Sequence, residues 1–146
     1  MEKDIVRFID QNRFLSNFYP CNVRCLDDDY PSSEHAYQAM KSKDPEVRKQ
    51  MKECKTPGEV RRLGKKIQIR PNWENMKYDI MLDIVSSKFE QHSDLKEKLL
   101  ATGKIKLIEG NDWNDTYWGI CRGAGENKLG EILMIVREYL KRKKLE

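Results

Sequence analysis

The stretch YPSSEHAYQAMK, residues 30–41, shapes how we interpret the rest of the chain. A proline followed by two serines is a typical helix start, because a serine side chain can accept a hydrogen bond from the exposed N–H groups of the first turn. We therefore predict a helix that begins at Ser32 or Ser33 and runs to about residue 43. Glu34, Gln38 and Lys41 follow one another at helical spacing and would share one face. The prediction is a packed helix with an acid, an amide and an amine along one wall.

Comparable signals mark the other elements. The pairs Asp44-Pro45 and Thr56-Pro57 each place an N-cap residue before a proline at the first helical position. Apolar residues at three- to four-residue spacing predict further helices. The predicted helices cover about 45–54, 57–65, 72–89 and 93–101, with a last one that includes 129–140. We predict strands over 5–9, 22–26 and 106–109, a turn at 27–29, and a strand or extended link at 67–69. The fold class is mainly α, a single compact domain with a few short β-strands.

Composition limits the classes of protein that the chain can belong to. Its 146 residues suit one domain, and 38% hydrophobic with 36% charged residues is typical of a soluble globular protein. The net charge of +4 permits a nucleic-acid partner but does not require one. No apolar run approaches about 18 residues, and the first residues lack the apolar core of a signal peptide. We predict a cytoplasmic protein without a membrane partner.

The cysteines and histidines do not form a metal-binding pattern. The four cysteines have no CxxC spacing, and only His35 and His92 could supply imidazole ligands. We therefore expect free thiols, no bound metal and no other cofactor.

A second dense run, DTYWGICRGAGENKLG, covers residues 115–130. Four glycines so close together suggest a loop that needs positive φ angles or close backbone approach. Its N–H groups, with those of the following helix, could hold a phosphate. Asp115 and Trp118 could form a wall opposite Glu34. Two carboxylates with an aromatic residue are typical of sites that hydrolyse glycosidic bonds.

A third run, FLSNFYP, covers residues 14–20. Its aromatic residues could anchor a loop on the core. Alternatively Phe18 or Tyr19 could stack on a base while Asn17 makes amide contacts. Trp73, at the start of a long helix, is by itself more typical of a core residue than of a ligand contact.

Together these runs resemble the NADAR superfamily, also called YbiA-like. The resemblance covers about residues 7–140 and rests on several motifs in order. They are FLSNFYP at 14–20, YPSSEHAYQA at 30–39, RLG at 62–64, WE at 73–74, KFEQ at 88–91, LLATG at 99–103, EG at 109–110, WG at 118–119 and the glycine-rich run through Gly130. In one departure, Cys121 stands where many members have glycine.

The resemblance implies an N-glycosidase that cleaves the bond between ribose C1 and a base nitrogen. Members of the family act on riboflavin-pathway intermediates or remove ADP-ribose from modified guanine, so an ADP-ribosylated nucleic acid is a further possible partner. By motif match, the expected catalytic residues are Glu34, Asp115 and Lys41, the last as a Schiff-base lysine. The expected substrate-binding residues are Asn17, Phe18, Tyr19, Gln38, Trp73, Trp118, Gly119 and Asn127.

Two other classes of function stay open from the sequence. A non-catalytic module that binds ADP-ribose or a nucleotide would keep the same aromatic residues and glycines. A structural or interaction protein could use the basic tail at 141–144 as a contact patch, although that tail also suits the negative end of a helix.

Overall fold

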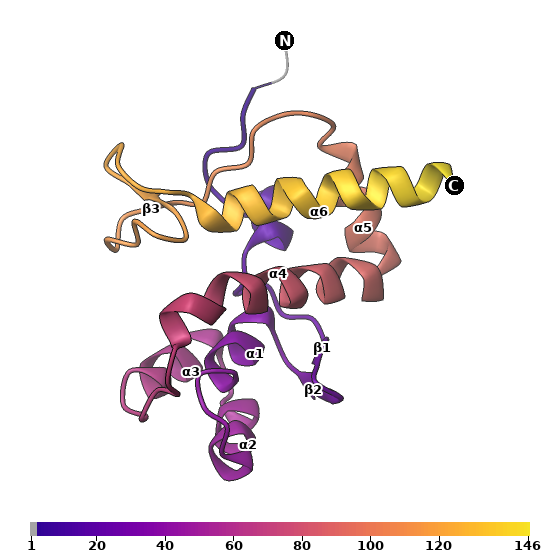
Figure 1. Cartoon of the computed structure of the whole chain (residues 1–146). Coiled ribbons are helices and arrows are strands. Elements are labelled where there is room, and N and C mark those ends of the chain that lie inside the picture. Colours follow the sequence, from indigo (N-terminus) through magenta and orange to yellow (C-terminus); the bar gives the residue numbers. More distant parts are fainter. Residues whose placement is uncertain (1–2) are drawn as a thin grey trace. The chain divides into compact units, whose positions relative to one another are not determined.

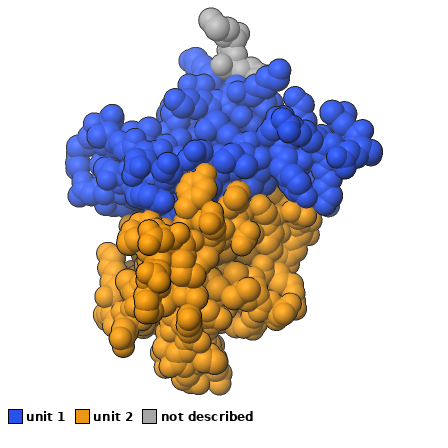
Figure 2. Space-filling model, viewed as in Figure 1, with its two compact units in different colours: residues 1–16, 92–146 blue, residues 17–91 orange. Residues whose placement is uncertain are grey.

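The computed structural model describes residues 3–146, in which helices dominate and the strands are short (Figure 1). The predicted fold class, mainly α with a few short strands, is confirmed. The chain divides into two compact units, which are coloured separately in Figure 2. One unit is Asn17–Gln91, and the other combines His92–Glu146 with the described residues up to Ser16. The assignment of all residues to one domain stays a prediction.

The unit Asn17–Gln91 begins with a tight hairpin. Strands β1 (Val23–Cys25) and β2 (Asp28–Tyr30) pair in antiparallel register. Leu26 and Asp27 connect them with φ angles of 48° and 62°, as a two-residue type I′ turn requires. The predicted strand at 22–26 is confirmed over its middle, but the predicted turn at 27–29 is too long.

Ion pairs explain why the acidic run continues as a strand. Lys52 pairs with Asp28, and Arg24 pairs with Asp29 across the hairpin. These cations offset the repulsion between neighbouring carboxylates, so both residues can remain in β2.

Four helices follow in this unit. They are α1 (Ser33–Ala39), α2 (Pro45–Glu53), α3 (Pro57–Gly64) and α4 (Trp73–Gln91). Helix α1 is buried along its whole length and contacts α2, α3 and α4. It is therefore the central helix of the unit.

The predicted N-caps of the first three helices are confirmed. The side chain of Ser32 accepts from the N–H of His35, and Asp44 and Thr56 make the equivalent bonds in α2 and α3. The predicted end of α1 at about residue 43 is wrong. After Ala39 the chain tightens, because the N–H of Lys41 donates to the carbonyl of Gln38 rather than four residues back.

The other unit contains a short 3-10 helix at Asp10–Leu15, α5 (Ser93–Ala101), strands β3 (Gly110–Asn111) and β4 (Ile120–Cys121), and α6 (Lys128–Leu145). Strands β3 and β4 pair in parallel, and α5 packs on α6. The predicted helices at 93–101 and around 129–140 are confirmed. The predicted cap at Ser93 is wrong, because His92 is the N-cap and makes no side-chain cap bond.

The strands predicted at 5–9 and 106–109 are largely wrong. Only Ile5 and Leu107 pair, as an isolated parallel bridge. Val6 and Ile9 are 58% and 56% exposed, so the apolar pattern does not reflect a buried strand. The predicted link at 67–69 is irregular chain.

The apolar stripe of α6 lies in the core as predicted. Its inward residues are Leu129, Ile132, Leu133, Val136 and Leu140, all at most 3% exposed. None of the helices within residues 3–146 combines the length and the apolar character that crossing a membrane requires.

Candidate functional site

Glu34 is a buried carboxylate in the first turn of α1. It is 8% exposed, and its N–H donates to the carbonyl of Asn17 at 3.0 Å. The Ser32 cap fixes the start of the helix, so the Glu34 side chain starts from a defined backbone position. The Oε1 atom of Glu34 accepts a hydrogen bond of 3.0 Å from Nε2 of Gln38. The predicted pairing of acid and amide along one face of the helix is therefore present.

A glycine of α3 leaves room for the side chain of Gln38. A Cβ atom at Gly64 would lie 1.9 Å from Oε1 of Gln38 and 2.8 Å from its Cδ. The helix α3 can approach α1 closely at this point only because Gly64 has no side chain. The missing side chain at Gly64 thus leaves space for the amide that orients Glu34, a role that the sequence alone does not indicate.

Lys41 lies two residues beyond the end of α1. Its Nζ is 5.5 Å from the centre of the Tyr37 ring. Burial lowers the pKa of the Lys41 ammonium below its ordinary value. The negative charge of Glu34 opposes this shift, whereas the positive charges of Arg61 and Lys77 add to it. The lowered pKa increases the fraction of neutral amine, which is the nucleophilic form.

Trp73 is the first residue of α4 and packs against Tyr37. Their ring centres are 5.3 Å apart with an interplanar angle of 54°. Trp73 is only 5% exposed, so most of its surface lies against protein. Tyr37 was not expected at the site, and it contacts both Trp73 and Lys41.

The run at 17–19 lies in the same unit. Asn17 contributes its carbonyl to Glu34, and its Nδ2 lies 3.5 Å from Sδ of Met81. Phe18 is 41% exposed, so it can offer ring surface to a ligand. The ring centre of Tyr19 is 5.6 Å from Nζ of Lys88.

Lys88 is an ionisable residue that sequence reasoning overlooked. It is 1% exposed, and burial lowers the pKa of its ammonium to about 8. Its Nζ also lies 5.1 Å from the centre of the Phe89 ring. The signal was available, because Lys88 follows Ile84 and Val85 at the spacing of the buried stripe of α4.

Asp115 and Trp118 lie together in the other unit. Oδ1 of Asp115 accepts from the N–H of Trp118 at 2.9 Å, and the Asp115 carbonyl accepts from Nδ2 of Asn111 at 2.9 Å. The Trp118 ring meets the Tyr117 ring edge-on, with centres 4.7 Å apart. This network holds a half-buried carboxylate and an aromatic ring on one loop.

Gly119 and Asn127 shape that loop. A Cβ at Gly119 would lie 2.1 Å from the carbonyl oxygen of Glu109, so no larger residue fits there. The Asn127 amide accepts from the N–H of Glu109 at 2.9 Å and donates to the carbonyl of Leu107 at 3.0 Å. Both halves of the amide thus already hold the protein's own backbone.

The predicted positive φ angles of the loop glycines are confirmed, but the predicted phosphate binding by the N–H groups at the start of α6 is wrong. Gly123 and Gly125 have φ angles of 78° and 148°, as loop glycines often do. The N–H groups of Lys128 and Leu129 donate to the carbonyls of residues 117 and 118. Because the chain itself occupies these donors, they cannot bind a phosphate.

The predicted site residues thus form two groups, one in each unit. Asn17, Phe18, Tyr19, Glu34, Gln38, Lys41 and Trp73 belong to Asn17–Gln91, whereas Asp115, Trp118, Gly119 and Asn127 belong to the other unit. That the two groups face one another stays a prediction. Within residues 3–146, no three His, Cys, Asp or Glu side chains gather as metal ligands would.

Comparisons with known proteins agree with the resemblance. The sequence model of the NADAR domain matches residues 6–141. N-glycosidase YbiA of Escherichia coli (strain K12) is 36% identical over 146 residues, which cover 96% of this chain and 91% of that protein. The riboflavin biosynthesis protein VVA0006 of Vibrio vulnificus is 39% identical over 135 residues, or 90% of this chain and 36% of that protein.

A solved structure extends the likeness from sequence to fold. The NMR structure of the E. coli protein YbiA matches with a TM-score of 0.89 and 36% identity, and the match covers 100% of this chain and 90% of that one. Sequence, family model and fold agree along nearly the whole chain. The chain belongs to the NADAR domain family.

Proposed function

We propose that Glu34 and Lys41 together cleave the bond between ribose C1 and a base nitrogen. The chain is a hydrolase that acts on N-glycosyl bonds, the activity that names its curated relatives. The observation that supports the proposal most strongly is the buried Glu34, oriented by Gln38, near an amine whose pKa burial lowers.

Glu34 would act on the charge that develops at C1. Departure of a base leaves an oxocarbenium-like sugar, which a nearby carboxylate stabilises. Alternatively Glu34 activates water or transfers a proton. The hydrogen bond from Gln38 restrains the carboxylate, so it would meet the reacting carbon without reorganisation.

Lys41 would form a covalent intermediate. Its neutral amine adds to C1, the bond from C1 to the base nitrogen breaks, and the base leaves with one of the two amine protons. The bond from C1 to the ring oxygen then opens, and that oxygen takes the second amine proton, which leaves an imine between C1 and Nζ. Water hydrolyses the imine, releases the sugar and restores the amine.

The remaining predicted residues would bind the substrate. Asp115 would contact ribose hydroxyls or help to protonate the leaving base. Phe18, Trp73 and Trp118 would stack on a base, each contributing about 1–3 kcal/mol. Gly119 and Asn127 would act mainly by shaping the loop that carries Asp115, since a close carbonyl and two backbone bonds already occupy them.

Two substrate classes fit this chemistry. One is a ribosylamino-pyrimidine intermediate of riboflavin synthesis, which the name of the V. vulnificus relative favours. The other is an ADP-ribosylated guanine, as a nucleoside or within nucleic acid. We further propose that the reaction takes place in the cytoplasm, without a membrane or an obligate protein partner.

A panel of ribosylated bases tests the proposal. Each compound is incubated with the protein, and the free base is measured by chromatography. Reduction with borohydride during turnover would fix the Lys41 imine as a stable amine, and mass spectrometry would find the added sugar on the peptide that contains residue 41. Binding of the panel without release of any base would instead favour the non-catalytic module.

A further inference from the structure

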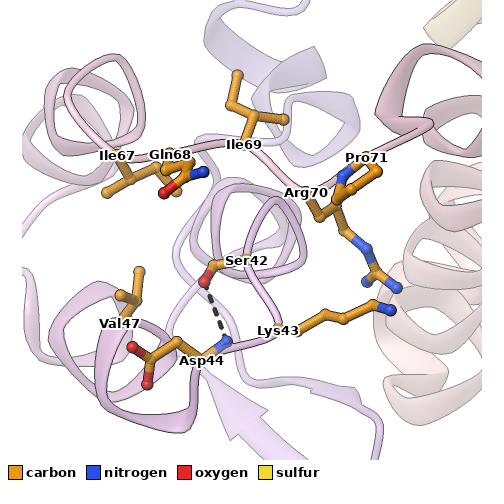
Figure 3. A pocket seen from close by; sticks show the side chains of 9 residues that line it. All are labelled: Ser42, Lys43, Asp44, Val47, Ile67, Gln68, Ile69, Arg70 and Pro71. Carbon is orange, nitrogen blue, oxygen red and sulfur yellow. Dashed lines mark hydrogen bonds between the residues drawn. The ribbon is translucent and has the colours of Figure 1, made fainter.

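The unit Asn17–Gln91 contains a groove that the proposed reaction does not use. It lies between the turn at 42–44, Val47 of α2 and the irregular segment at 67–71 (Figure 3). Its volume of about 330 Å³ is near the lower end of the range for small-molecule sites. The turn at 42–44, α2 and the segment before α4 therefore border an open groove large enough for a ligand.

One end of the groove carries two cations. Figure 3 shows that Lys43 and Arg70 extend toward the same side, away from Val47 and Ile67. Within residues 3–146 neither cation forms an ion pair. Two cations at one end of a groove, with no carboxylate paired to either of them, attract an anion.

The hydrogen-bonding groups of Arg70 are incompletely used. Its Nη1 donates to the carbonyl of Met40 at 3.4 Å, but its buried Nε has no partner among the described residues. A buried donor on a charged group is costly when it is left without an acceptor. A ligand oxygen would satisfy it once the guanidinium turned to expose this atom to the groove.

Ser42 offers a third donor. It is 7% exposed, and its Oγ already accepts from the N–H of Asp44 at 3.0 Å. Its hydroxyl proton has no acceptor among the contacts made by the described residues. The hydroxyl can therefore donate to a ligand in the groove, in addition to the two cations.

The other end of the groove differs in chemistry. Val47 and Ile67 supply apolar surface, and the carboxylate of Asp44 lies on the same side as Val47 in Figure 3. Apolar walls suit a flat ring, and a carboxylate accepts from hydroxyl or amino groups. The groove is thus cationic at one end and apolar with an acceptor at the other.

We propose that this groove binds a nucleoside monophosphate or a ligand of that class. The phosphate would lie at Lys43, Arg70 and Ser42, and the base and sugar against Val47, Ile67 and Asp44. The groove adjoins the site already described, because the N–H of Arg70 donates to the carbonyl of Lys41 at 2.8 Å. A bound ligand would stabilise the turn that carries Lys41.

Titrations with adenosine 5′-monophosphate, adenosine and inorganic phosphate test this proposal. They use the Glu34→Gln protein, and chromatography checks that each probe stays intact, so the result does not depend on the catalytic proposal. Amide resonances in NMR spectra report the location, and we expect saturable shifts at 42–44 and 67–70. The monophosphate should bind more tightly than adenosine or phosphate.

Lys43→Gln is the informative variant, and Lys49→Gln is its control, because Lys49 is an exposed lysine of the same region outside the groove. Loss of one charged contact to phosphate should weaken binding by about tenfold in Lys43→Gln, with little change in the control. Three results would each overturn the assignment. The two variants could bind the monophosphate equally well, the protein could bind phosphate as tightly as the monophosphate, or the shifts could be confined to residues around Trp73.

Discussion

Replacement of Gly64 by alanine should impair the enzyme through Gln38, although neither residue is expected to take part in covalent chemistry. The added Cβ would lie 1.9 Å from Oε1 of Gln38, whereas ordinary contacts begin near 3.4 Å. The amide would have to move by about 1.5 Å, because the new Cβ is fixed to the backbone at the end of α3. Its hydrogen bond of 3.0 Å to Glu34 would not survive such a movement.

The size of the effect follows from two terms. Overpacking a well-filled core typically costs about 1–3 kcal/mol in the free energy of unfolding. Misplacement of a reacting group by about 1 Å can reduce the rate about 100-fold. We therefore expect Gly64→Ala to lower the free energy of unfolding by about 1–3 kcal/mol and kcat by about 10- to 100-fold.

Gly58 provides a matched control in the same helix. A Cβ there would meet only Nη1 of Arg62 at 3.5 Å and Oγ1 of Thr56 at 4.0 Å. Gly58→Ala should leave activity unchanged and stabilise the fold by up to about 1 kcal/mol. Urea unfolding and chromatographic measurement of base release compare the two variants.

A second variant tests the cause. In a Gln38→Ala background the space next to residue 64 is empty, so adding Gly64→Ala should cost little further stability. If Gly64→Ala matched Gly58→Ala in both stability and kcat, the reasoning that links Gly64 to Glu34 would be refuted.

Three further predictions concern titratable groups. Burial lowers the pKa of His35, whose Nδ1 is 2.7 Å from Oγ of Ser32 and whose Nε2 is 2.9 Å from the carbonyl of Cys54. The unfolded chain therefore binds the proton more readily, so the free energy of unfolding should fall as pH drops below about 6.5. Urea unfolding at several pH values measures this fall, and a free energy that does not change with pH would contradict the prediction. The pKa of Lys88 is lowered to about 8, so stability should rise between pH 8 and about 10.4, and this rise should be absent in Lys88→Met. Because only the neutral Lys41 amine attacks, base release should increase with pH up to its lowered pKa and then level off. Lys41→Arg should lose this activity and the borohydride-trapped adduct, and an unchanged adduct would exclude Lys41.

Local features of the fold were predictable from the sequence. The caps at Ser32, Asp44 and Thr56 depend on side chains within three residues of the helix start, so the sequence contains all the information that they need. The long apolar stripes of α4 and α6 were equally clear. The four-residue spacing of Glu34 and Gln38 was also enough to predict that their side chains lie on one face, because both residues belong to one helix.

Features that depend on distant residues were not predictable. The early end of α1 follows from tight bonds after Ala39, which helix propensity does not reveal. The contact between Gln38 and Gly64 joins two helices, and its only sequence signal is a glycine. The burial of Lys88 depends on the packing of α4, and a lysine is ordinarily expected at the surface, so this core position was not predicted. Apolar residues at 5–9 suggested a strand, but only one of them finds a pairing partner.

The central claim is that the Glu34 carboxylate drives departure of the base, and one measurement tests it most directly. The rate of base release is measured under single-turnover conditions for the wild-type and Glu34→Gln proteins, with the best substrate from the panel. Circular dichroism and urea unfolding confirm that both are folded. We predict that the variant releases base about 10²- to 10⁴-fold more slowly. A folded Glu34→Gln protein that releases base at the full rate would contradict the account.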